Sequence, residues 1–171
     1  VATVHHHVGP KRDLYMKTYK GLLDAAETFF HDIISQVMSA DVLNPKVRAQ
    51  LPARLIDSFV ELVAGNPVRA RLFMRHWLDS PDELAEVEAE VSLPLYRKLY
   101  EVLTSAREAG IIRLSVDPGL FMRSVEWLVY GYFISGAFDW DQWRSDPQSA
   151  SNLEQFKAFM REYIIRMLDV P

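Results

Sequence analysis

The chain has 171 residues, 49% hydrophobic and 25% charged, which is the composition of a folded globular protein rather than a disordered one. A formal net charge of -4 excludes a uniformly basic surface, so any contact with nucleic acid must be local. The absence of cysteine excludes disulfides and thiolate chemistry and fits a cytoplasmic location, and the most apolar stretch, residues 127–138, is too short to span a membrane.

Apolar residues recur at helical spacing almost throughout, and we see no strand-like alternation flanked by hairpin turns. The predicted fold is therefore an all-α helical bundle. A first short helix is expected over residues 2–7, ending where Gly9 stops one helix and Pro10 opens the next. A long second helix is expected over residues 11–38, because its apolar residues form one broad face.

Cap-and-proline pairs predict where the following helices begin. Asn44-Pro45 opens a helix that runs to Ala64-Gly65, and Asn66-Pro67 opens a shorter one that ends near residue 79. The capping box Ser80-Pro81-Asp82-Glu83 then opens a helix that continues to about residue 109, before Gly110. The body of the protein should thus contain about six helices.

Two further helices complete the predicted bundle. Asp117-Pro118 opens a strongly apolar helix to about residue 138, and residues 149–151 open the last amphipathic helix. The segment between these two helices is predicted to be a polar, tryptophan-containing loop.

One short segment carries the sharpest functional signal. It reads Thr3-Val4-His5-His6-His7-Val8-Gly9-Pro10-Lys11-Arg12-Asp13-Leu14-Tyr15. It resembles the end of the DNA-binding domain of TetR/AcrR-family regulators, in which a recognition helix of the form T-(L/V)-Y-(Y/H)-H-F precedes a Gly-Ser-Lys turn and a long helix. The sequence departs from this pattern in having His5, Val8 and Pro10 where the family usually has Tyr, Phe and Ser.

The resemblance implies a TetR-like fold whose helix-turn-helix head lacks its N-terminal part here. Residues 1–20 would be the remnant of that head, and residues 21–171 the ligand-binding and dimerisation domain. The expected function is a non-enzymatic, ligand-responsive transcription regulator, a repressor that a small lipophilic or aromatic effector releases from a palindromic operator. The partners implied are DNA for the full-length protein, the effector and a second copy of the chain, with no cofactor and no membrane.

The candidate DNA contacts follow from the same segment, because a helix in the major groove needs small or polar side chains at its start and phosphate donors at its end. They are Ala2, Thr3, His5, His6, His7 and Lys11. The histidine triplet can also be read as a tag remnant or a polar surface turn. We predict no metal site there, because neighbouring residues on a helix point apart.

TetR-like bodies hold a small-molecule pocket, and large side chains that can line one are numerous here. The candidates are Phe29, Phe59, Phe73, Met74, Trp77, Tyr96, Tyr100, Phe121, Glu126, Trp127 and Tyr130. For each apolar one, packing in the bundle core is the more usual role. Glu126 is the most informative, because a carboxylate in an apolar helix needs either a charged partner or a ligand. The candidate partners are Arg123, Arg71, Arg75 and His76.

The last two helices resemble the family's four-helix dimer interface. Two apolar stripes at helical spacing are the candidates for it: Tyr130, Phe133, Ile134 and Ala137 on one helix, and Phe159, Tyr163 and Met167 on the other. An alternative function is a protein-interaction module that does not bind DNA. An all-α enzyme is a weaker alternative, because the sequence has no phosphate-binding loop, zinc motif or nucleophile elbow.

Overall fold

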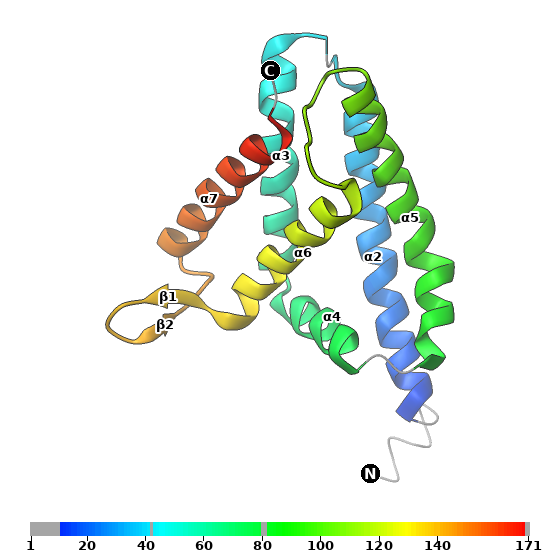
Figure 1. The fold of residues 1–171 in the computed structure, drawn as a ribbon. Helices are drawn as coiled ribbons and strands as arrows, with labels where there is room; N and C mark the ends of the chain where they lie inside the picture. The colour runs from blue at the N-terminus through cyan, green and yellow to red at the C-terminus, as the bar shows by residue number, and fades with distance from the viewer. Residues whose placement is uncertain (1–10, 42, 80–81, 170–171) are drawn as a thin grey trace.

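The computed structural model describes residues 11–41, 43–79 and 82–169, which form six helices and one small hairpin (Figure 1). In chain order these elements are α2 (Lys11–Ser39), α3 (Pro45–Ala64), α4 (Pro67–Asp79), α5 (Asp82–Glu108), α6 (Pro118–Ser135), β1 (Ala137–Asp139), β2 (Trp143–Ser145) and α7 (Ala150–Leu168). The predicted all-α bundle is confirmed. The short helix predicted over residues 2–7 lies outside the described residues.

Helix starts fall where the cap residues predict them. The Asn44 side chain accepts a hydrogen bond from Lys46 N at 3.0 Å, and the Asp117 carboxylate accepts one from Leu120 N at 3.0 Å. Ser149 caps α7 in the same way. Each cap satisfies a backbone N–H that has no partner within its own helix, which is why these boundaries follow from local sequence.

The prediction for the end of α6 and the segment after it is wrong. The helix ends at Ser135 rather than near residue 138, because Gly136 adopts φ 81°, a left-handed conformation that interrupts the helix. Strands β1 and β2 then pair antiparallel where a loop was predicted. Asp139 Oδ1 accepts hydrogen bonds from the backbone N–H groups of Asp141 and Gln142, at 2.8 and 3.0 Å, which forms the turn between the strands.

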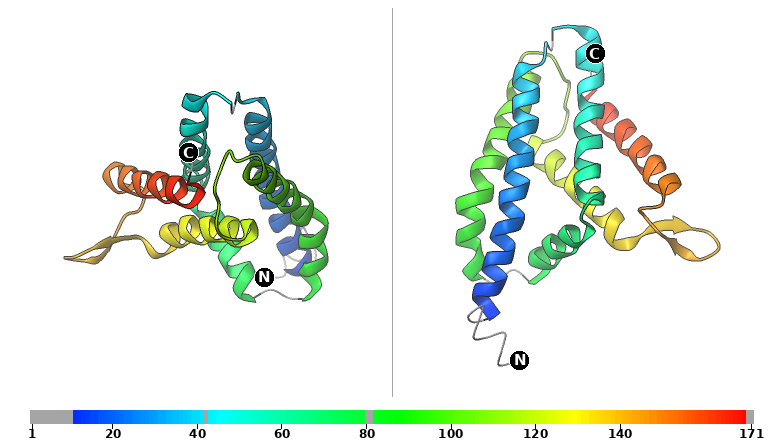
Figure 2. Two further views of the ribbon diagram at one scale, coloured as in Figure 1. Left: turned by 45° about the horizontal axis from the view of Figure 1, so that its top comes forward. Right: turned by 180° about the vertical axis from the view of Figure 1, so that it is seen from behind.

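The helices are arranged around α6. Helices α2 and α5 lie side by side on one flank and α3 packs against α7 on the other, while α6 contacts α3, α4 and α5 (Figures 1 and 2). The β1–β2 hairpin projects from the α6–α7 corner. Side chains on α6 can therefore face both flanks at once. Among the described helices, none combines the length and apolarity needed to cross a membrane.

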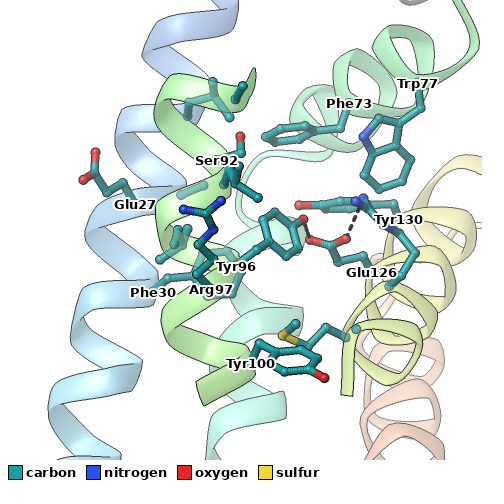
Figure 3. Close-up of a pocket in the computed structure, with 18 of the residues that line it drawn as sticks. Glu27, Phe30, Phe73, Trp77, Ser92, Tyr96, Arg97, Tyr100, Glu126 and Tyr130 are labelled. Atoms are coloured by element: carbon teal, nitrogen blue, oxygen red, sulfur yellow. Dashed lines mark hydrogen bonds and ion pairs between the residues drawn. The ribbon is translucent and has the colours of Figure 1, made fainter. Parts of the chain in front are cut away.

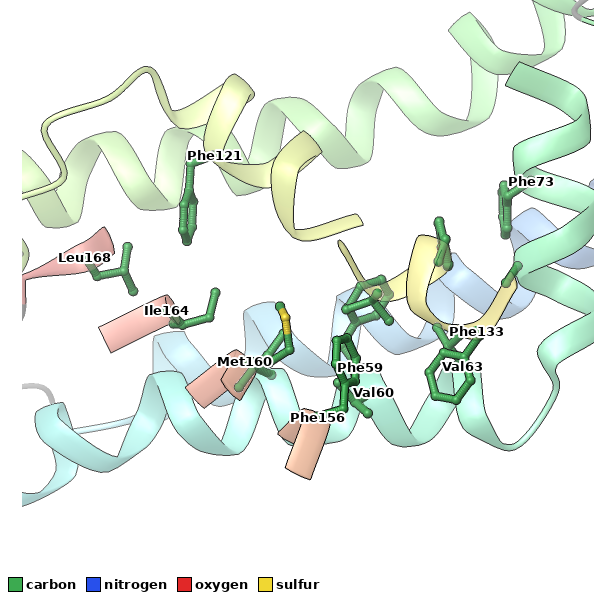
Figure 4. Packing of buried hydrophobic residues seen from close by; sticks show 14 of the residues in the cluster. Phe59, Val60, Val63, Phe73, Phe121, Phe133, Phe156, Met160, Ile164 and Leu168 are labelled. Carbon is green, nitrogen blue, oxygen red and sulfur yellow. The ribbon is translucent and has the colours of Figure 1, made fainter. Parts of the chain in front are cut away.

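The core lies chiefly between α3, α6 and α7 (Figure 4). Val60, Val129 and Met160 have no exposed side-chain surface, and Phe133 packs edge-on against Phe156 at a centroid distance of 6.2 Å. Two ion pairs close the α3–α7 seam at its edge: Lys157 Nζ to Glu61 Oε1 at 2.8 Å and Arg161 Nε to Asp57 Oδ1 at 2.7 Å. This side of the bundle is filled, unlike the side that α2 and α5 enclose.

Candidate functional site

A cavity of about 540 Å³ opens between α2, α4, α5 and α6 (Figure 3). Its volume falls within the range of roughly 300–1,000 Å³ that is usual for small-molecule sites. Aromatic side chains form much of its wall, with Tyr19, Phe73, Trp77, Tyr96 and Tyr130 among the lining residues. These residues come from four helices, so the site exists only in the folded bundle.

Among the charged residues that line this cavity, Glu126 is the buried one. Its side chain is 8% exposed, and Arg123 Nη1 lies 3.0 Å from its Oε2 atom. The Tyr96 hydroxyl on α5 donates a hydrogen bond to Oε1, and the two side chains point toward one another in Figure 3. Each carboxylate oxygen thus has one partner, as a buried charge requires. The predicted neutralisation of Glu126 by an arginine is confirmed, and the partner is Arg123.

Burial dominates the electrostatics of this cluster. It raises the pKa of Glu126 above the ordinary value of 4.5, while the hydrogen bond from Tyr96 and the charge of Arg123 oppose that rise. The pKa of Tyr96 is raised by burial and by the neighbouring Glu126 charge, and that of Tyr130 is raised for the same two reasons. Both tyrosines are therefore neutral hydrogen-bond donors at any physiological pH.

The Arg123 guanidinium also faces two aromatic rings. Its Cζ atom lies 5.0 Å from the centroid of the Trp77 ring and 5.2 Å from that of the Tyr96 ring. Both distances are within the range of about 6 Å over which an aromatic face attracts a cation. Trp77, Tyr96 and Glu126 together form a site for a positive charge, which we call the cation site.

A second cavity, of about 790 Å³, lies beyond this cluster between α2, α3, α5, α6 and the end of α7. Its lining is mainly apolar, with Leu51, Leu99, Val102 and Ile112 among its residues, and Arg48, Lys98 and Glu101 line it as well. Four residues line both cavities: Phe30, Tyr96, Met122 and Glu126. The cation site therefore stands at the boundary between an aromatic chamber and an apolar one.

The structure brings most of the predicted pocket residues to these two cavities. Phe73, Trp77, Tyr100 and Tyr130 line the first, Phe59 and Phe121 line the second, and Tyr96 and Glu126 line both. Phe29 and Met74 are partly buried and pack against the core instead. Trp127 is 55% exposed and lines neither cavity, because α6 turns it away from both flanks.

Sequence reasoning missed lining residues on α2. Tyr19 and Leu23 are buried and one helical turn apart, and that spacing is the signal that could have identified them. His76 is fully buried, and its ring lies against that of Tyr19 at a centroid distance of 4.2 Å and an interplanar angle of 35°. His76 was a candidate partner for Glu126, but its ring packs against α2.

The predicted dimer residues divide into two groups, and this requires a correction. Tyr130, Phe133 and Ala137 are buried within the single chain, at 5%, 3% and 7% exposure, so they cannot contact a second copy in this conformation. Helix α6 is apolar nearly all round, and periodicity could not tell its inner face from its outer one. Ile134 and Phe159 are exposed, whereas Tyr163 and Met167 are partly buried.

Replacing Arg123 with methionine tests the cluster, because it leaves the buried Glu126 carboxylate without its cation. We expect the free energy of unfolding to fall by about 1–3 kcal/mol near neutral pH. The pKa of Glu126 is higher in the folded state than in the unfolded state. At a pH between these two pKa values, the carboxyl group is protonated in the folded state and ionised in the unfolded state. The free energy of unfolding therefore falls as the pH rises through this range. The loss should therefore be smaller at about pH 5 than at about pH 8.

Chemical denaturation at the two pH values measures this difference. Arg71→Met, which removes an exposed arginine from α4, is the matched control and should change stability little at either pH. An equal loss for Arg123→Met at both pH values would show that Glu126 does not respond to the missing charge.

The candidate DNA-contacting residues Ala2, Thr3, His5, His6 and His7 lie outside the described residues. Lys11 is the first residue of α2, and its side chain is not described. The resemblance of residues 3–15 to TetR/AcrR regulators therefore remains a prediction. No protein-family model matches the chain, and a comparison with curated proteins finds no match.

Proposed function

We propose that this chain is the ligand-binding and dimerisation body of a ligand-responsive transcription regulator of the TetR/AcrR type. The observation that carries the proposal is the pair of adjoining cavities that share four lining residues, one of them the buried carboxylate of Glu126. A mostly apolar cavity with a few convergent polar groups is the usual form of a small-molecule site. Such a site suits a lipophilic or aromatic effector.

Helix α2 gives the cavities a route to the proposed DNA-binding head. It begins at Lys11, directly after the segment that resembles a recognition helix, and its residues Tyr19, Leu23 and Phe30 line the first cavity. A ligand that fits one position of α2 better than another shifts the population toward that position. We infer that effector binding moves the start of α2 and so disfavours the spacing of two heads on a palindromic operator.

The outer face of α6 and α7 is the surface that we propose for the dimer. Leu120, Trp127 and Ile134 are exposed and seven residues apart, so they form one stripe along α6. Ser124 Oγ and Tyr163 Oη are 2.8 Å apart, which places this stripe beside α7, where Phe159 is 52% exposed. We call these exposed residues of α6 and α7 the outer stripe, and a two-fold dimer would bury it.

A thermal-shift screen of small apolar compounds tests whether the body binds a ligand, because a ligand that binds only the folded state raises the melting temperature. Ala26→Phe should abolish the shift by filling the first cavity, which Ala26 lines on α2. Ala49→Phe, on the exposed face of α3, is the matched control and should keep it.

The second stage tests regulation. Any compound that stabilises the body should release the full-length protein from operator DNA selected from a random pool. If ligand and operator bind the full-length protein without affecting each other, the regulatory proposal is wrong.

One observation favours a different function. The hairpin exposes Phe138, Trp140 and Trp143 at 57%, 92% and 68%, and the Phe138 ring contacts each tryptophan ring edge-on. An exposed aromatic cluster is typical of a protein-interaction surface. A full-length protein that enriches no sequence from the random DNA pool would favour this interaction module over a regulator.

A further inference from the structure

The Arg123 side chain lies where a ligand cation would be held. Its guanidinium donates to Glu126 Oε2 at 3.0 Å and faces the Trp77 and Tyr96 rings at 5.0 and 5.2 Å. Carboxylate and aromatic faces together are the usual means of binding an organic cation. Arg123 therefore shows directly which chemistry the cation site accepts.

Arg123 is also the member of the cluster that can leave most easily. Its side chain is 37% exposed, against 8% for Glu126, so water can solvate the guanidinium once it moves out. Its ion pair with Glu126 joins two residues one turn apart on α6, and its contacts with other helices are those with the ring faces of Trp77 on α4 and Tyr96 on α5. Glu126 would stay in place, because the Tyr96 hydroxyl on α5 donates to its other oxygen. A cation from solution can thus replace Arg123 without opening the bundle.

The second cavity determines what must be attached to such a cation. It adjoins the cation site through Phe30, Tyr96, Met122 and Glu126, and its remaining lining is mainly apolar, with Arg48, Lys98 and Glu101 as the charged exceptions. A long hydrocarbon or aromatic tail would pass from water into this cavity, and the burial of its apolar surface would favour binding. A small, fully polar cation would leave this volume unused.

We propose that the site binds an organic monocation with an apolar tail, whose ammonium or guanidinium head displaces the Arg123 guanidinium from Glu126, Trp77 and Tyr96. The proposal rests on the proposed ligand-binding function and names its ligand class. A head with N–H donors is favoured, because Glu126 Oε2 already accepts from an N–H group. An anionic head is disfavoured at the cation site, since the Glu126 carboxylate would repel a second carboxylate there.

Titration calorimetry with four probes of equal chain length tests this class: dodecylguanidinium, dodecyltrimethylammonium, dodecanol and dodecanoate, each below its critical micelle concentration. We expect dodecylguanidinium to bind most tightly, about 10- to 100-fold better than dodecanol, because a hydrogen bond to a charged group is lost with the alcohol. Dodecyltrimethylammonium should fall between them, since it keeps the charge without the N–H donors.

Two variants give opposite expected results, which a purely structural ion pair would not. Arg123→Met removes the competing guanidinium and should tighten dodecylguanidinium binding about tenfold. Glu126→Gln keeps an acceptor for Tyr96 but removes the charge, and should bring dodecylguanidinium down to the affinity of dodecanol. The double variant should behave like Glu126→Gln, and circular dichroism of each variant confirms that it is folded.

Dodecanoate binding more tightly than dodecylguanidinium, with Arg123→Met abolishing it, would overturn the proposal in favour of an anion held by Arg123. Weaker dodecylguanidinium binding by Arg123→Met, or no binding of any probe by the wild-type chain, would overturn it as well. The proposed function fails separately, when no compound in the wider screen both binds the body and releases operator DNA.

Discussion

Phe133→Ala is expected to lower the free energy of unfolding by about 3–5 kcal/mol, one of the largest effects of any single substitution in this chain. Phe133 is 3% exposed and packs edge-on against Tyr132 and Phe156, at centroid distances of 5.2 and 6.2 Å. Removing its ring leaves a void between α6 and α7, which the surrounding helices can fill only partly. Urea denaturation followed by circular dichroism measures the loss.

Phe138→Ala is the matched control, because it removes the same ring from a side chain that is 57% exposed on the hairpin. It should cost well under half as much. The comparison also tests whether Phe133 belongs to the core or to a dimer interface. If Phe133→Ala left stability unchanged and instead weakened self-association, Phe133 would belong to an interface rather than to the core.

Trp127→Glu is expected to convert a dimer into a monomer, raising the dissociation constant about 100-fold or more. Trp127 lies at the middle of the outer stripe on α6, between Leu120 and Ile134, and is 55% exposed in the single chain. A carboxylate there would face its own symmetry mate across a two-fold axis and lose its hydration. Sedimentation equilibrium over a range of concentrations measures the change.

Trp140→Glu makes the same chemical change at the hairpin, where the side chain is 92% exposed, and should leave the association unchanged. Circular dichroism should show equal helix content in both variants, because neither tryptophan is buried. A wild-type chain that sediments as a monomer at every concentration would contradict the proposed interface. Loss of association in Trp140→Glu alone would indicate that the dimer interface lies at the hairpin.

The positions of the helices could be predicted from the sequence because helix ends obey local rules. Asn44 and Asp117 accept hydrogen bonds from backbone N–H groups two or three residues away, so the signal for each start lies within one turn. Gly110, with φ 68°, lies just beyond α5, because glycine readily adopts the left-handed conformation that ends a helix. The same local chemistry explains the hairpin turn at Asp139 and the end of α6 at Gly136, although the apolar run through residue 138 favoured a longer helix.

The candidate site could be predicted only in part. Glu126 stood out as a carboxylate in an apolar helix, and Arg123 was among its candidate partners because the two residues are one turn apart. Tyr96 is 30 residues from Glu126 along the chain, and no periodicity relates them. Their contact depends on α5 packing against α6, which is a property of the whole bundle.

The sequence by itself therefore determined the all-α class, the helix boundaries set by caps and the presence of a carboxylate within an apolar helix. Only the tertiary structure decided that Phe133 faces the core while Trp127 and Ile134 face outward, and that Arg123 lies between Trp77 and Tyr96. The physical reason is range: capping acts over a few residues, whereas burial depends on which helices pack together. For a helix as apolar as α6, its neighbours alone determine which side is inside.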